Sequence, residues 1–333
     1  MSERSELLKN WLADILEAGD YELTPASADA SFRSYLRLSL RNETYIIMDA
    51  PPRHEDCRPF IDITERLHQC QVNAPVIHNK NIEQGFLLLS DFGDELYLPN
   101  LNKDTADKLY KNAIDTLVKM QVRGNVAGIK RYDESLLRNE MALFKDWLLG
   151  QHLQINMNNV ISKNLEAIFD LLVDNALEQP QVFVHRDFHS RNLMLTGENN
   201  PGVIDYQDAV QGPLSYDLVS LLKDCYIKWT GQEIKEWVDF YLQQLTKEKP
   251  ELNIDSTQFQ RWFDLMGVQR QLKASGIFAR LSHRDNKHGF LKDIPRTLSY
   301  IVDLKPDYPE LNPLCQLIEE SVLPALEQKT CSP

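Results

Sequence analysis

The feature that most constrains this chain of 333 residues is a single segment, residues 182–208. The segment contains three apolar stretches with the length of short strands, residues 182–184, 193–195 and 202–204. In the polar loops that follow them, Asp187 precedes Asn192 by five residues, and Asp205 comes directly after the last stretch. We expect loops of this kind to turn all three side chains into one cleft.

This order of residues fits phosphoryl transfer. A kinase uses one carboxylate to orient the attacking hydroxyl and accept its proton, and an amide with a second carboxylate to hold Mg2+ across the phosphates of ATP. The spacing of Asp187 and Asn192 is that of the kinase catalytic loop. We therefore predict Asp187 as the catalytic base, and Asn192 and Asp205 as Mg2+ ligands.

Two short stretches elsewhere in the chain resemble kinase motifs but lack the rest of the pattern. The His-Arg-Asp at 283–285 has Phe290 five residues after its aspartate, and no apolar strand precedes it. The Asp-Phe-Gly at 91–93 imitates a kinase magnesium motif but lies before the catalytic loop instead of after it. The complete order at 182–208 therefore favours a kinase site over the alternative, ordinary polar loops around a strand pair.

The segment resembles the aminoglycoside phosphotransferase and choline kinase superfamily, whose loops read His-x-Asp-x-His-x-x-Asn and are followed by Ile-Asp-x-x-Asp/Glu. The resemblance implies an α+β, protein-kinase-like fold with a small β-rich N-terminal lobe and a larger helical C-terminal lobe. It also implies that Asp217 braces the catalytic loop from a helix N-terminus, although a plain helix cap is equally compatible. His185, His189 and Asp208 take supporting positions in the same pattern.

A narrower resemblance is to bacterial kinases of peptidoglycan recycling, which phosphorylate N-acetylmuramate and N-acetylglucosamine at the anomeric hydroxyl. The matching stretches are residues 29–37, 48–52, 205–209, 216–222 and 269–280. Two alternatives stay open: a kinase of another alcohol such as choline, homoserine or an aminoglycoside, and a nucleotide-binding pseudokinase. A cationic substrate would call for an acidic cleft, whereas the stretch 258–284 is basic. Its candidate sugar-binding residues are Arg270, Arg280 and Arg284.

The expected nucleotide site departs from the kinase pattern. No glycine-rich loop is present, and Met48 stands where a strand lysine should pair with the phosphates. We predict that Arg33 replaces this lysine, with the backbone N–H groups of Ser31 and Phe32 cradling phosphate. We expect Glu65, on the following helix, to pair with Arg33. The alternative is that both side chains are exposed to solvent and have no role in nucleotide binding. By resemblance to kinases, adenine should lie against the backbone near Leu89 and Asp91.

The patterning along the chain predicts two domains. A helical pattern at 3–18 is followed by a period-two hairpin at 35–48, a helix at 58–70 and short strands at 75–78 and 85–89. Long amphipathic helices, such as 105–122 and 134–149, dominate the rest of the chain. We expect a nucleotide-binding lobe at 1–91 and a helical lobe with the catalytic loop and sugar site at 92–333.

Composition excludes some partners. The net charge of −13 disfavours nucleic acid, because a polyanion would be repelled over most of the surface. No stretch approaches the roughly 20 apolar residues of a membrane span. Five scattered cysteines without a paired motif suggest free thiols in a reducing compartment. We expect a cytoplasmic enzyme with a small-molecule substrate, and the sequence does not indicate its oligomeric state.

Overall fold

The computed structural model describes residues 3–16, 20–28 and 33–330. The chain divides into two compact units. Unit 1 consists of Met1–Asn100 and Asn192–Asp208, and unit 2 of Leu101–Arg191 and Ala209–Pro333. Unit 1 thus extends beyond the expected boundary at residue 91 and includes a segment that returns to it from much later in the chain.

Unit 1 is built on a five-stranded antiparallel sheet in the order β1-β2-β3-β5-β4. Its strands are β1 (Tyr21–Ala28), β2 (Ser34–Leu40), β3 (Glu43–Asp49), β4 (Ile77–Asn81) and β5 (Phe86–Ser90). The predicted hairpin is confirmed as β2 and β3. Strand β1 was not expected, because its sequence is polar and contains Pro25, which fits only an edge strand, here at a bulge between Pro25 and Ser27.

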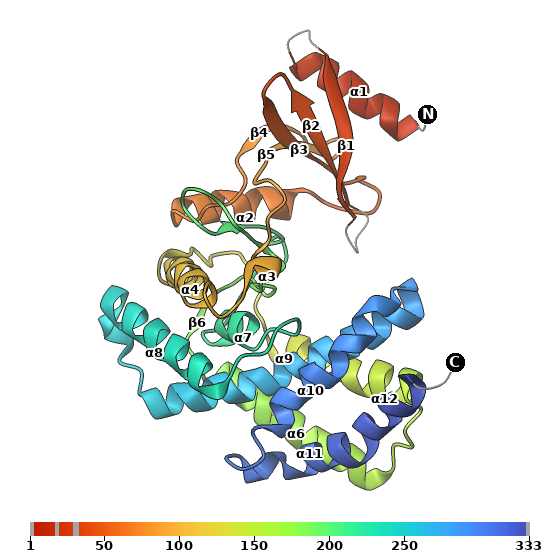
Figure 1. Cartoon of the computed structure of the whole chain (residues 1–333), viewed down its shortest axis with the longest axis vertical. Helices are drawn as coiled ribbons and strands as arrows, with labels where there is room; N and C mark the ends of the chain where they lie inside the picture. The colour runs from red at the N-terminus through yellow and green to blue at the C-terminus, as the bar shows by residue number, and fades with distance from the viewer. Residues whose placement is uncertain (1–2, 17–19, 29–32, 331–333) are drawn as a thin grey trace. The chain divides into compact units, whose positions relative to one another are not determined.

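Two helices accompany this sheet. Helix α1 (Glu3–Ile15) packs on one face, where Trp11 stacks on Phe86 with ring centroids 5.4 Å apart (Figure 1). Helix α2 (Arg58–Gln69) begins with a proline in its first turn, as is common at a helix start. From α2, Phe60 stacks on Tyr206 and Thr64 shares a 2.8 Å hydrogen bond with the Tyr206 hydroxyl. The residue after Asp205 is therefore anchored in the core of unit 1.

A short hairpin explains why the segment 192–208 belongs to unit 1. Strands β7 (Leu193–Met194) and β8 (Gly202–Val203) pair with each other. Their outer backbone groups bond to the earlier part of the unit, with Leu195 N–H donating to Glu95 O at 2.7 Å and Val203 N–H to Asn73 O at 2.8 Å. Helix α3 (Tyr97–Asn100) ends the first stretch of unit 1.

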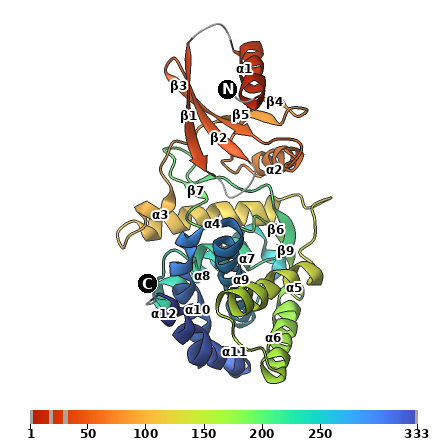
Figure 2. The same ribbon diagram turned by 90° about the vertical axis from the view of Figure 1, so that its right-hand side faces the viewer.

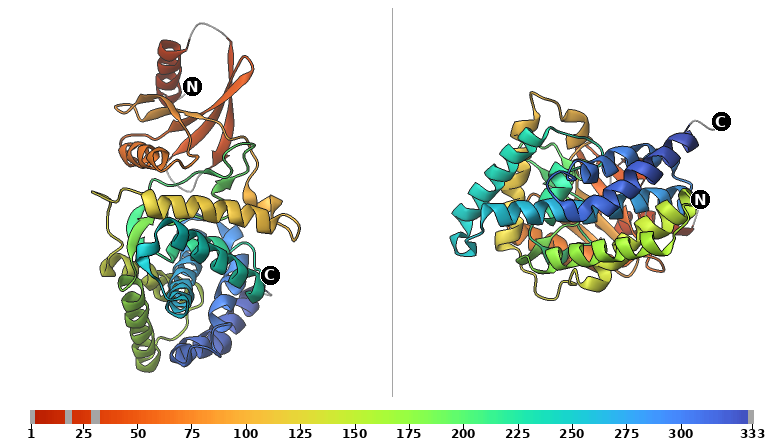
Figure 3. Two further views of the ribbon diagram at one scale, coloured as in Figure 1. Left: turned by 90° about the vertical axis from the view of Figure 1, so that its left-hand side faces the viewer. Right: turned by 90° about the horizontal axis from the view of Figure 1, so that it is seen from below.

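Unit 2 is helical and is centred on one long helix, α9 (Ser256–Asp285), most of whose residues are buried (Figure 2). Around α9 lie α5 (Glu134–Leu143), α6 (Asn159–Leu177), α7 (Tyr216–Leu222) and α10 (Ile294–Val302). Helix α4 (Ala106–Arg123) packs against α8 (Gly231–Glu248) (Figure 3). Helices α11 (Asn312–Leu317) and α12 (Leu323–Thr330) complete the C-terminal part, and β6 (Gln181–Val184) pairs with β9 (Val210–Pro213).

The helix expected at 134–149 is present but changes its winding. Helix α5 ends at Leu143, and a π-helical segment, η1 (Phe144–His152), continues it. Gly276 of α9 lies against this junction, where a Cβ atom would overlap the backbone of Leu143 and Phe144. The close approach of α9 therefore coincides with the point where the helix widens.

Within residues 3–16, 20–28 and 33–330, no helix combines the length and the apolar character needed to cross a membrane.

Candidate functional site

The catalytic loop begins in unit 2, directly after β6, and its first residues are held by Asp217. This buried carboxylate, in the first turn of α7, accepts a hydrogen bond from the His185 N–H at 2.7 Å and from the Arg186 N–H at 3.0 Å. Arg186 has a φ of +79°, which is rare for a residue with a side chain. The two bonds hold the backbone beside Asp187 in this strained conformation.

A second buried carboxylate, Asp224, holds the far side of the loop. It accepts hydrogen bonds from the N–H of Ser190 and from the N–H of Tyr226, each at 3.1 Å. Sequence reasoning missed Asp224. Asp224 lies just beyond the end of α7 (Tyr216–Leu222), outside the sequence pattern that singled out Asp217.

A buried ion cluster lies beside Asp187. Glu140 of α5 is 6% exposed and binds the guanidinium of Arg186. The Lys273 ammonium, from α9, lies 3.2 Å from the same carboxylate and donates to the Tyr216 hydroxyl at 2.9 Å. Tyr132 donates a short hydrogen bond to the other oxygen of Glu140. The cluster brings charged side chains from two separate segments, α5 and α9, to the catalytic loop.

This cluster sets the protonation of Asp187. Burial by itself would raise the pKa of Asp187, but the positive charges of Lys273, His189, Arg270 and Arg186 outweigh it and lower the pKa to about 2. Burial raises the pKa of Asp217 to about 7, against the pull of its two backbone donors. Asp187 is therefore fully ionised at neutral pH, whereas Asp217 is not.

The two predicted histidines lie in the same loop. The His185 ring is buried against Phe188, and its Nδ1 accepts a 3.2 Å hydrogen bond from the Asp187 N–H. The His189 ring contacts Tyr226 edge-on, with centroids 5.7 Å apart. Both rings thus shape the loop on either side of Asp187.

The three arginines predicted to bind sugar have different surroundings. Arg270 is buried, with its charge near Asp187 and a 3.8 Å contact to the Cys225 sulfur. Arg280 is partly buried, and among the described residues its Nε has no hydrogen-bond partner. Arg284 is exposed and makes two hydrogen bonds to Asp285, at 2.8 and 2.9 Å. Arg270 is therefore the one that lies within the electrostatic environment of Asp187.

The predicted metal ligands belong to unit 1. The Asn192 amide donates to one oxygen of Asp205 at 3.3 Å, and the Gln207 amide donates to the other at 2.8 Å. Asp205 has a φ of +63°, a second strained position in the motif. No cluster of three or more His, Cys, Asp or Glu side chains suited to a metal occurs in the described part of the chain. A cation here would rely on Asn192, Asp205 and oxygens from a bound phosphate.

The predicted nucleotide residues also lie in unit 1. Ser31 and Phe32 fall outside the described residues, while Arg33 directly precedes β2 and is half-buried. Leu89 is buried on β5. Asp91 binds Arg37 through both oxygens, at 2.6 and 3.1 Å. Burial by itself would raise the pKa of Asp91, but the hydrogen bonds from Arg37 and from the Gly93 N–H outweigh it and lower the pKa below its usual value.

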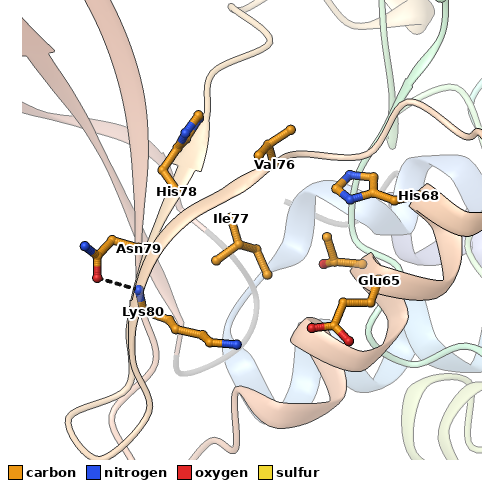
Figure 4. A pocket seen from close by; sticks show the side chains of 8 residues that line it. Glu65, His68, Val76, Ile77, His78, Asn79 and Lys80 are labelled. Carbon is orange, nitrogen blue, oxygen red and sulfur yellow. Dashed lines mark hydrogen bonds between the residues drawn. The ribbon is translucent and has the colours of Figure 1, made fainter.

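Glu65 lines a cavity of about 400 Å³ between α2 and β4. Figure 4 shows Glu65 and Lys80 on facing sides of this cavity, with Ile77 between them. Asp208, the last predicted supporting residue, is exposed at the end of the unit 1 segment. The structure thus gives Glu65 a polar cavity and leaves Asp208 at the surface.

Comparison with known proteins gives a consistent result. Residues 22–252 match the family described as phosphotransferase enzyme family, APH. The chain is 44% identical to an N-acetylmuramate/N-acetylglucosamine kinase of Pseudomonas putida, over 90% of this chain and 88% of that kinase. It is 45% identical to the kinase of the same name from Pseudomonas aeruginosa, over 89% of this chain and 88% of that kinase. The kinase of that name from Neisseria meningitidis is 36% identical over 96% of each chain.

Solved structures share the fold at low sequence identity. A choline kinase from Cryptosporidium parvum matches with a TM-score of 0.64 and 13% identity, over 93% of this chain and 98% of its own. An ADP-bound aminoglycoside phosphotransferase matches with a TM-score of 0.58 and 13% identity, over 89% and 97%. These likenesses confirm the predicted kinase-like α+β fold.

Proposed function

Because the chain belongs to the phosphotransferase enzyme family, we propose that it is an ATP-dependent kinase of N-acetylmuramate, N-acetylglucosamine or both, acting at the anomeric hydroxyl. The observation that carries this proposal is the identity of 44–45%, over 89–90% of the chain, to kinases named for these two sugars. The product would be a sugar 1-phosphate, made from a sugar recovered from peptidoglycan. A reaction that uses ATP and recovered sugars belongs in the cytoplasm.

The residues of the catalytic loop and the segment after it would divide the chemistry. Asp187 orients the acceptor hydroxyl and takes its proton, while Asn192 and Asp205 hold Mg2+, which bridges the phosphates of ATP and offsets their charge. The donor set supports this role, because an amide oxygen and a carboxylate are hard oxygen ligands of the kind Mg2+ prefers.

The electrostatics of Asp187 favour an acidic acceptor hydroxyl. A carboxylate whose pKa is about 2 is a good hydrogen-bond acceptor but a weak base. In a loose phosphoryl-transfer transition state the proton leaves late, so such a carboxylate works best with a hydroxyl that gives up its proton readily. The anomeric hydroxyl of a sugar is a hemiacetal and is more acidic than the alcohol of choline. This supports an anomeric acceptor.

The lactyl carboxylate of N-acetylmuramate would need a cation, and a bidentate arginine suits it best. Arg270, Arg280 and Arg284 remain the candidates. Arg280 is favoured by its partly buried position and its spare Nε donor among the described residues, whereas Arg284 already binds Asp285.

The nucleotide would be held mainly by unit 1. Adenine would contact backbone near Leu89 and Asp91, and Arg33 would meet the phosphates in place of the absent strand lysine, with Ser31 and Phe32 beside it. Glu65 remains the proposed partner of that cation.

The test is an ATP-consumption assay with N-acetylmuramate, N-acetylglucosamine, choline and kanamycin, followed by phosphorus NMR of the product. We expect turnover with at least one N-acetylated sugar and a product phosphorylated at the anomeric oxygen. The methyl glycoside, whose anomeric oxygen is blocked, is the control and should not react. A sugar 6-phosphate would overturn the anomeric assignment, and an inactive protein with every acceptor would favour a pseudokinase.

A further inference from the structure

The ion cluster of Arg186, Glu140 and Lys273 carries an inference that deepens the proposed function and rests on it. We propose that Lys273 is a positioning residue for Asp187: through Glu140 and Tyr216 it fixes the loop beside the base and keeps the base ionised. Nothing in the sequence motif identifies this lysine, which lies 86 residues after Asp187 in the chain.

The first argument is that Lys273 reaches the catalytic loop by two independent routes. On one side it lies 3.2 Å from Glu140, and the same oxygen of Glu140 binds the side chain of Arg186. On the other side it donates at 2.9 Å to the hydroxyl of Tyr216, whose neighbour Asp217 accepts the Arg186 N–H. Both routes end at Arg186, the residue with positive φ that directly precedes Asp187.

The second argument is energetic. Lys273 is 7% exposed and Glu140 is 6% exposed, so both charges have lost most of their hydration. Such groups commonly contribute no net stability, and apolar residues of similar volume often serve as well or better. A lysine buried at this position of α9 is therefore best explained by what it does for its neighbours.

The third argument is charge balance. Arg186 and Lys273 carry two positive charges, and Glu140 carries one negative charge. Asp187 supplies a second negative charge that offsets the excess. Removing Lys273 would leave Asp187 with a weaker positive field, so burial would raise the pKa of Asp187. The groups that face Asp187 or this cluster from the surrounding elements are Arg186, His189, Glu140, Tyr132, Tyr216, Asp217, Arg270 and Lys273.

The experiment compares Lys273→Met with Lys273→Arg, using the sugar that the wild-type enzyme phosphorylates best. We expect Lys273→Met to lower kcat about 100-fold, the size of effect typical of a slightly misplaced catalytic group, with the KM for ATP changed less than about threefold. Between pH 4.5 and 8, kcat of Lys273→Met should fall at the acid end of the range, where the wild-type profile stays flat. Lys273→Arg should recover most of kcat and the flat profile.

Lys223→Met is the matched control. Lys223 is also buried, at 6% exposure, and pairs with Asp264 at 2.7 Å, but within the described part of the chain none of its side-chain contacts leads to Arg186. Its loss should lower the midpoint of thermal unfolding without creating the acid limb. The same acid limb in Lys223→Met would overturn the inference.

Glu140→Gln is a second variant that distinguishes a positioning role from a purely structural one. It keeps the inference testable if Lys273→Met does not fold. It removes a negative charge, so it should lower kcat without an acid limb, opposite in pH behaviour to Lys273→Met. A wild-type kcat and pH profile in Lys273→Met, or in Glu140→Gln, would overturn the inference. Asp187→Asn serves as the reference: if it stays active, the proposed base fails, whereas an inactive Asp187→Asn with a normal Lys273→Met contradicts the inference alone.

Discussion

Arg186 and Asp205 have positive φ angles although neither is a glycine. Arg186 directly precedes the predicted base Asp187, and Asp205 is itself a predicted metal ligand. Such conformations cost of order 1–3 kcal/mol and persist only where neighbouring groups hold them. For Arg186 the holding group is Asp217, through two backbone hydrogen bonds. At the residue scale, the geometry of the loop therefore depends on a carboxylate some thirty residues away.

Asp217→Asn should weaken this support. An amide offers one acceptor oxygen and turns an N–H toward the second backbone donor, so one buried N–H loses its partner at a cost of about 1–3 kcal/mol. We expect a lower free energy of unfolding in urea and a larger proportional loss in kcat than in binding of ATP. Asp303→Asn, which removes an exposed partner of Lys228, should change neither by a measurable amount. If Asp217→Asn matches this control, Asp217 is no more than a helix cap.

Asp205→Ala should impair Mg2+-dependent binding of ATP more than Asn192→Ala. A carboxylate contributes a full charge to the cation, whereas an amide contributes only a dipole. Isothermal titration of ATP at several Mg2+ concentrations measures the difference. Equal and unchanged metal dependence in both variants would place the metal site elsewhere.

At the scale of elements, α9 organises unit 2 because it carries both the buried cations Arg270 and Lys273 and the glycine that allows it to approach α5. A helix in contact with so many neighbours must be nearly apolar around its circumference or must pair its charges. Lys273 follows the second course by pairing with Glu140. The position of the cations relative to the catalytic loop thus depends on how closely α9 packs.

Gly276→Ala tests this packing. A methyl group at Gly276 would overlap the backbone of Leu143 and Phe144, which cannot move as a flexible side chain can. We expect a loss of about 1–3 kcal/mol in the free energy of unfolding, typical of overpacking. Gly289→Ala is the matched control, because a methyl group there has no neighbour within 4 Å. Equal stability of the two variants would mean that α9 and α5 pack less tightly than these distances require.

At the scale of the whole molecule, unit 2 contains a histidine pair, the buried His152 and the exposed His283, that links distant parts of the chain. His152 Nδ1 and His283 Nε2 lie 3.0 Å apart, joining η1 to the end of α9. Burial, His283 and Lys329 lower the pKa of His152 to about 4. The folded state therefore favours the neutral ring, while the unfolded chain binds a proton below about pH 6.5.

This difference gives a pH dependence with a definite sign. The contribution of His152 to stability is fully present above about pH 6.5 and is lost as the pH falls toward about 4. We expect the free energy of unfolding of the wild type, minus that of His152→Gln, to decrease by about 1–3 kcal/mol over this interval. Urea unfolding at several pH values measures it. A difference that is constant or increases as the pH falls would contradict the lowered pKa.

Much of this protein could be predicted from the sequence, because the informative features are local. Hydrophobic periodicity predicted the hairpin of β2 and β3 and the long helices, and the spacing of Asp187, Asn192 and Asp205 within one short segment indicated kinase chemistry. Such features depend on residues near one another in the chain, so their order and period carry the information. The roles of these three residues stay predictions until their variants are measured.

Other features were decided only by the tertiary structure. The return of segment 192–208 to unit 1 depends on backbone hydrogen bonds to residues 73 and 95, and backbone groups leave no trace in side-chain patterning. In the sequence, Glu140 is an ordinary helix charge and Lys273 is one of several basic residues in the stretch 258–284. Their burial beside Arg186 depends on how α5 and α9 pack together, a contact between residues more than a hundred positions apart. Local order determined which chemistry this chain carries, and long-range packing determined which charges surround it, because a charge acts through space and not along the chain.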